Sequence, residues 1–209
     1  MSEKKEHPIL FSAPMVRATL DGQKTQTRRV VRKQFAPNAA PAEVPATSPE
    51  GWQISGHSGL WWDDAGNCFI DEAIRCPYGK PGDLLWGREA WRAPASCDHL
   101  PPRSISDSES VRFISDEVTG RDAGFGKGRP GMFMPRWASR ILLKVTAVRI
   151  ERLNDIGPED CLAEGIEKRS GGRCELTGEY QRLWEAINGP GSWDANPWVW
   201  VVEFNRVPA

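Results

Sequence analysis

Residues 198–207 (WVWVVEFNRV) form a nearly continuous apolar run, and no other feature constrains the fold of this chain as strongly. A strand that is apolar at almost every position has no face suited to water, so it belongs in the centre of a sheet with both faces covered. A second β-type run, residues 141–153, alternates apolar residues such as Leu143 and Val145 with polar neighbours. That alternation is typical of a strand. The two runs predict the middle of a covered sheet.

Shorter patterns surround these runs in a chain of 209 residues, a length typical of one domain. Three further strands are predicted at residues 8–12, 23–31 and 83–91, and three helices at 14–21, 157–165 and 177–187. Strands and helices do not alternate as β-α-β units would. The predicted fold class is therefore α+β, with five or six strands in a small barrel-like sheet and short helices beside it.

Two stretches lack the pattern of core elements. Residues 34–75 begin with an alanine- and proline-rich segment, which is typical of an extended linker, and continue into a glycine-flanked hairpin. Residues 94–131 are rich in Ser, Asp, Gly and Pro. We therefore predict a single domain over residues 1–209 with insertions at about 34–75 and 94–131.

Composition excludes several classes of protein. Hydrophobic residues make up 39% and charged residues 26% of the chain, as in folded globular proteins. No apolar run approaches the roughly 18–20 residues that span a membrane, and the apolar stretch near the N-terminus is too short for a signal peptide. Five cysteines without such a signal are typical of reduced thiols. We expect a cytoplasmic protein with no membrane partner.

The charge balance is nearly neutral, but the residue types are not evenly used. Net charge is −1, arginine outnumbers lysine 19 to 8, and there are ten tryptophans. Arginine recognises phosphates and bases through its planar guanidinium, and tryptophan offers stacking faces. Two interpretations stay open: a nucleic-acid surface, or a tryptophan-rich core with solvated arginines. A third possibility is that Trp52, Trp61 and Trp62 in the first insertion dock on a host protein.

The cysteines do not predict a metal site. Cys68, Cys76, Cys97 and His99 are spaced unlike the Cys-x2-4-Cys pairs of zinc sites. The glycine-rich segment 124–128 lacks the flanking strand and helix of a phosphate-binding loop. We therefore expect no metal and no cofactor.

Several segments taken together resemble a known family. They are residues 11–17 (FSAPMVR) with 20–29 (LDGQKTQTRR), 76–83 (CPYGKPGD), 134–140 (MPRWASR) and 192–198 (SWDANPW). This set resembles the ASCH-domain proteins of bacteriophages and prophages, a branch of the PUA-like superfamily. The resemblance covers most of the chain outside the two insertions. It implies a PUA-like small β-barrel with flanking helices and a cleft for RNA, DNA or a modified nucleoside.

The resemblance also implies site residues. Bacterial 4-acetylcytidine amidohydrolases, within the wider family, are similar around Gly22-Gln23-Lys24-Thr25-Gln26-Thr27-Arg28-Arg29. By position, their catalytic lysine, threonine and glutamate fall on Lys24, Thr27 and Glu164. Other ASCH proteins are similar to ribonucleases.

The residues themselves permit this chemistry. Between Lys24 and Arg32 there are four cationic residues and no acid. Crowded cations disfavour one another's charge, so a partly buried Lys24 is expected to have a lowered pKa and to act as a base. Thr27 is then an activatable nucleophile, and Glu164 an acid for a leaving amine. Residues three apart on a strand face opposite sides, so this pairing requires a turn at 24–27. The simpler alternative is that the cations bind phosphate.

A second group of residues favours nucleic-acid contact. Arg136 and Arg140 flank Trp137, and together with Arg28 and Arg29 they are predicted to bind a nucleic-acid backbone and stack a base. The alternative is that Trp137 packs in the core.

Two functions follow as hypotheses. The first is a hydrolase of phage origin, either an amidohydrolase on an acylated cytidine or a ribonuclease that needs no metal. The second is a non-catalytic module that binds nucleic acid or protein, as a phage regulator or counter-defence factor.

Overall fold

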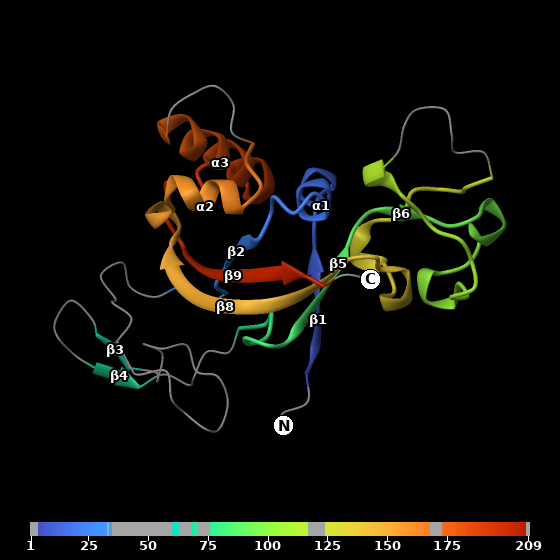
Figure 1. Cartoon of the computed structure of the whole chain (residues 1–209), viewed down its shortest axis with the longest axis horizontal. Coiled ribbons are helices and arrows are strands. Elements are labelled where there is room, and N and C mark those ends of the chain that lie inside the picture. The colour runs from blue at the N-terminus through green and yellow to red at the C-terminus, as the bar shows by residue number, and fades with distance from the viewer. Residues whose placement is uncertain are drawn as a thin grey trace.

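The computed structural model of the chain describes residues 4–32, 34, 60–62, 68–70, 76–116, 124–167 and 173–207 (Figure 1). Within the first insertion only the backbone of a hairpin is described, in which β3 (Leu60–Trp62) pairs antiparallel with β4 (Cys68–Ile70). The predicted docking patch at Trp52, Trp61 and Trp62 thus lies outside the described side chains.

A five-stranded sheet forms the centre of the molecule. Its order is β1 (Glu6–Leu10), β5 (Leu84–Arg88), β8 (Leu142–Arg152), β9 (Trp198–Arg206) and β2 (Gln26–Val30). β1 runs parallel to β5, and the other neighbours are antiparallel. The two long apolar runs are the adjacent strands β8 and β9, so the prediction of a sheet built around them is confirmed. A register shift between Val145 and Ala147 interrupts their pairing.

β9 is buried on both faces, as its composition requires. Trp200, Val202 and Phe204 pack on one face in a core cluster with residues of β1, β5 and β8. Val199 and Val201 pack on the other face in a second cluster. The alternation follows from the two-residue period of a strand. The apolar residues of β9 therefore serve two cores at once.

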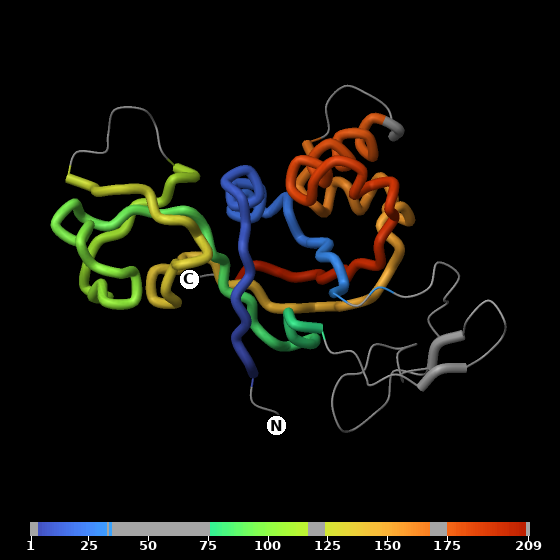
Figure 2. Tube along the Cα trace, turned by 180° about the vertical axis from the view of Figure 1, so that it is seen from behind, coloured from blue at the N-terminus to red at the C-terminus, as the bar shows by residue number. Residues whose placement is uncertain are grey.

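The sheet is strongly curved but open within the part of the chain that the structure describes. β8 and β9 bend around one side, while β1 and β2 are the two edges (Figures 1 and 2). No described pairing joins β1 to β2, so the α+β class is confirmed but the expected closed barrel is not found. Instead, a side chain spans the gap: Arg29 Nη2 donates to the Leu10 carbonyl at 2.6 Å.

Three α-helices among the described residues accompany the sheet. α1 (Ala13–Leu20) connects β1 to β2, with Pro14 in its first turn, where a missing N–H costs nothing. α2 (Pro158–Ala163) follows Gly157, whose N–H donates to Asp160 Oδ2 at 3.1 Å. α3 (Arg173–Asn188) is longer than the predicted 177–187. α2 and α3 bury Cys161, Tyr180 and Trp184 against the outer face of β9.

The second insertion has a small core of its own. β6 (Trp91–Arg92) pairs antiparallel with β7 (Arg112–Phe113), and Trp91 is buried with Ile105 and Met134 in a third cluster. Most of the remaining chain is in short turns: η1 (Ala95–Cys97), η2 (Pro102–Ser104), η3 (Ile114–Asp116), η4 (Gly131–Phe133) and η5 (Arg136–Ala138), with η6 (Leu153–Asp155) after β8. The region is irregular, as predicted, yet it packs as a unit.

No helix among the described residues combines the length and the apolar character needed to cross a bilayer.

The core predicts a contrast between two neighbouring leucines of β8. Leu143 is fully buried in the first cluster, whereas Leu142 is half-buried. Leu143→Ala should lower the free energy of unfolding by about 2–5 kcal/mol, because it removes buried methyl groups and leaves a cavity. Leu142→Ala, the matched control, should cost about 1 kcal/mol. Urea unfolding measures both, and equal losses would contradict the assignment of faces.

Candidate functional site

The segment between α1 and β2 turns at Asp21 and Gly22, ahead of the turn predicted at 24–27, and Gln26 and Thr27 already lie in β2. Gly22 has a φ of +74°, a left-handed conformation that favours glycine. The backbone N–H groups of Gln23 and Lys24 both donate to the Ala18 carbonyl at 2.9 Å, and β2 begins only at Gln26. Lys24 therefore precedes the strand. The alternation of side chains between the two faces of a strand therefore applies to Thr27 but not to Lys24.

Lys24 is buried and fully hydrogen-bonded. Its side chain is 0% exposed, and Nζ donates to Glu164 Oε2 at 2.7 Å, to the Glu164 carbonyl at 2.9 Å and to the Gln26 carbonyl at 2.7 Å. Burial lowers the pKa of the Lys24 amine, Glu164 opposes this shift, and Arg29 and Arg28 add to it. The expected lowering is confirmed, but burial contributes more to it than the crowded cations do.

Glu164 caps the C-terminal end of α2 and is 3% exposed. Lys24 holds Oε2, whereas Oε1 has no hydrogen bond among the described residues, and its nearest cation is Arg28 Nη1 at 3.6 Å. Gly165, with a φ of +89°, ends the helix and lies against Lys24, where a Cβ would come within 3.2 Å of the lysine Cβ. The helix end and the lysine are thus packed as one unit.

Arg28 is engaged within the protein. Its side chain is fully buried on the α2 side of β2, with Nη2 at 3.0 Å from Glu151 Oε2 and 3.2 Å from Asp160 Oδ2. Burial alone would raise the pKa of Asp160, but the N–H of Gly157 and the charge of Arg28 bring it below its usual value. The Arg28 guanidinium predicted for nucleic acid therefore lies among carboxylates. Neither Glu151 nor Asp160 was found by sequence reasoning, since both are distant in the chain.

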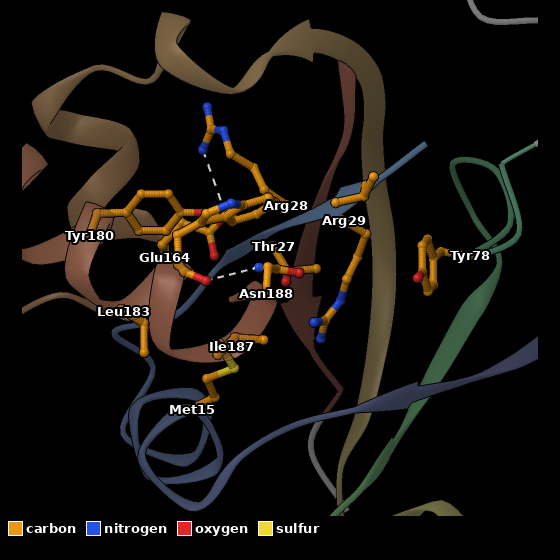
Figure 3. Close-up of a pocket in the computed structure, with 12 residues that line it drawn as sticks. Met15, Thr27, Arg28, Arg29, Tyr78, Glu164, Tyr180, Leu183, Ile187 and Asn188 are labelled. Carbon is orange, nitrogen blue, oxygen red and sulfur yellow. Dashed lines mark hydrogen bonds and ion pairs between the residues drawn. The ribbon is translucent and has the colours of Figure 1, made fainter. Parts of the chain in front are cut away.

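A small cavity of about 110 Å³ lies over the edge strand β2 (Figure 3). Polar groups of Thr27, Arg29 and Glu164 line it together with residues that the sequence did not indicate, among them Tyr78 and Asn188. Met15 of α1 and Tyr180, Leu183 and Ile187 of α3 also line it, as do Arg28 and Val30 of β2 and Trp184 of α3 (Figure 3). Thr27 and Glu164 thus share one cavity, and Glu164 connects it to Lys24.

The free edge of β2 also faces this region. The Gln26 carbonyl points away from β9, where it accepts the bond from Lys24 Nζ. Because the bonding direction alternates along an antiparallel strand, Arg28 and Val30 also direct backbone N–H and C=O groups away from β9. Both residues line the cavity, so a backbone donor and acceptor lie beside it.

The second predicted group does not reach the cavity. Arg136 pairs with Glu6, its Nε 2.7 Å from Oε2. Trp137 packs edge-on against Trp91, with ring centroids 6.3 Å apart, as the alternative interpretation of a core role expects.

Arg140 also has partners within the protein. Its Nε donates to Glu89 Oε1 at 2.9 Å, its Nη2 donates to Asp116 Oδ1 at 2.8 Å, and its guanidinium carbon lies 3.9 Å from the centre of the Phe113 ring. The structure thus places this arginine in an ion-pair network that ties the second insertion to the sheet.

Within residues 4–32, 76–116, 124–167 and 175–207, no group of three or more His, Cys, Asp or Glu side chains is arranged to hold a metal ion.

Comparison of the chain with protein-family models, with curated proteins and with solved structures finds no match.

The buried ion pair predicts strong coupling between its two residues. Lys24→Met or Glu164→Gln alone should cost about 3–5 kcal/mol of unfolding free energy, because each leaves a buried partner uncompensated. The double variant should cost clearly less than the sum. Lys144→Met, which removes an exposed lysine on β8, is the control and should change stability by about 0.5 kcal/mol or less. Additive losses in urea unfolding would contradict the coupling.

The lowered pKa of Lys24 predicts a pH dependence with a defined sign. Above the folded pKa, the native state binds fewer protons at Lys24 than the unfolded state, whose lysine titrates near about 10.4. Stability therefore rises with pH in that window. The free energy of unfolding of the wild type, relative to Lys24→Met, should increase as pH is raised toward about 10.4. A flat or falling difference would show that the pKa is not lowered.

Proposed function

We propose that the protein is an amidohydrolase that removes an acyl group from the exocyclic nitrogen of a cytosine-type base. One observation carries the proposal. Glu164 is held by Lys24 through one oxygen, its other oxygen is buried without a hydrogen bond among the described residues, and the residue lines a cavity together with Thr27. A buried acceptor without a partner suits a ligand that donates an N–H. An acyl amide supplies that group.

The resemblance to ASCH-domain proteins supports the same proposal. Three of the segments that carry it contribute to the cavity: residues 11–17 through Met15, 20–29 through Thr27, and 76–83 through Tyr78. We propose that the chain is an ASCH protein and that its curved, open sheet is a PUA-like barrel with a gap between β1 and β2. Residues 134–140 belong to the structure around the second insertion, and residues 192–198 lead into β9.

The proposed reaction starts with the movement of one proton within the buried ion pair of Lys24 and Glu164. In the first step, a proton moves along the 2.7 Å bond from Lys24 Nζ to Glu164 Oε2 and leaves a neutral amine and a neutral carboxyl group. The amine then accepts the Thr27 hydroxyl proton as Oγ1 attacks the acyl carbonyl. Glu164 donates its proton to the leaving nitrogen as the C–N bond breaks. Water hydrolyses the acyl-threonine, releases the acid and restores the side chains.

The size and charge of the cavity favour this substrate over a phosphodiester. Pockets for drug-sized ligands measure about 300–1,000 Å³, so about 110 Å³ suits a single ring. Arg28 is paired with Glu151 and Asp160, and the Glu164 carboxylate belongs to the lining beside Arg29. A phosphate placed there would meet a carboxylate. A neutral acyl amide avoids this repulsion.

The alternative is a module that binds without catalysis, and one observation favours it. All three donors of the Lys24 ammonium are satisfied inside the protein, as in a purely structural ion pair. In that case, Lys24 and Glu164 only fix the loop before β2 against α2.

Two threonines distinguish the hypotheses. Thr27 is buried and lines the cavity, whereas Thr25 is exposed and does not. With N4-acetylcytidine as substrate and chromatography of the released cytidine, Thr27→Val should lower kcat at least about 100-fold, because the nucleophile is lost. Thr27→Ser should retain part of the activity, and Thr25→Val all of it. Full activity of Thr27→Val would refute the mechanism. Binding of the nucleoside without turnover by the wild type would favour the non-catalytic module.

A further inference from the structure

The large apolar side chains that are exposed gather in one region. Among the described residues they are Leu10, Val30, Met132, Phe133 and Ile187, here called the apolar strip. Val30 and Ile187 line the cavity over β2. The strip therefore begins at the candidate site.

Printed contacts connect the rest of the strip to the cavity. Arg29, which lines the cavity, donates to the Leu10 carbonyl at 2.6 Å. Leu10 in turn lies against Gly131, where a Cβ would meet Leu10 Cδ1 at 2.9 Å. Met132 and Phe133 follow directly in η4. Their exposed fractions are 59% and 55%, and that of Leu10 is 50%.

Arginines accompany the strip. Arg29 lies between the cavity and Leu10, and Arg88 Nη1 donates to the Met132 carbonyl at 3.3 Å. Arg88 also stacks on Trp86, its guanidinium carbon 4.5 Å from the ring centre. Arg29 and Arg88 thus bring positive charge next to exposed apolar residues of the strip.

This combination matches single-stranded nucleic acid better than a protein surface. Aromatic and apolar faces that alternate with arginines stack bases and bind the backbone between them. A cavity suited to one ring leaves the remainder of any polynucleotide outside its mouth, where the strip begins. A protein partner would require no such single-ring cavity at one end of its interface.

We propose that the substrate base belongs to a single-stranded polynucleotide and that the strip binds its flanking nucleotides, with Phe133 as a stacking face. The proposal rests on the proposed function, since it deepens the choice of substrate at the same site. Arg88 holds a backbone phosphate next to the base on Phe133. The strip then selects nucleic acid over free nucleoside.

The test compares binding and turnover in the same variants. Fluorescence anisotropy with a short labelled single-stranded RNA that contains N4-acetylcytidine should show binding about tenfold weaker for Phe133→Ala. Arg88→Ala should weaken binding and reduce its salt dependence. Arg103→Ala, which removes an exposed arginine on η2, is the matched control and should bind like the wild type. Hydrolysis of free N4-acetylcytidine by Arg103→Ala should be unchanged, and thermal melting verifies that each variant is folded.

Several outcomes would overturn the proposal. One is that Arg88→Ala and Arg103→Ala weaken RNA binding equally, and another is that Phe133→Ala leaves RNA binding unchanged. A third is that the protein binds no RNA and forms a dimer that Phe133→Ala dissociates. Failure of the proposed function has a different signature. If the wild type binds RNA through Phe133 but releases no acyl group from either substrate, the strip is supported as an RNA-binding surface and the amidohydrolase function is refuted.

Discussion

The buried ion pair between Lys24 and Glu164 is the interaction on which the rest of the site depends. Removing two charges from water is costly, and the cost is offset here because the lysine makes three hydrogen bonds and the carboxylate also lies near Arg28. The pair joins the loop before β2 to the end of α2. Every side chain of the cavity that comes from β2 is placed relative to this junction.

The open sheet explains why a cavity exists at that junction. β1 and β2 are both edge strands, with α1 between them in the chain and α3 beside β2 (Figure 1). A closed barrel would pair the two edges and fill the gap. Here the Arg29 side chain spans it instead, and Arg28 and Val30 of β2 line the cavity.

The arginines illustrate how one residue type serves different purposes. Arg28 neutralises carboxylates beneath the cavity, and Arg140 ties the second insertion to the sheet through Glu89 and Asp116. Arg29 and Arg88 lie beside exposed apolar groups at the surface. A count of arginines therefore indicates little about nucleic-acid binding, because burial and partners decide what each guanidinium can still contact.

The sequence alone determined the central strands, because the nearly continuous apolar run of β9 needs both faces covered, and it determined the turn before β2, where Gly22 permits a left-handed backbone. Only the tertiary structure decided the partners of Arg28, since Glu151 and Asp160 approach it from distant segments through the pairing of β8 with β9 and the packing of α2. Local patterns fix local conformation, whereas long-range packing selects which charges meet.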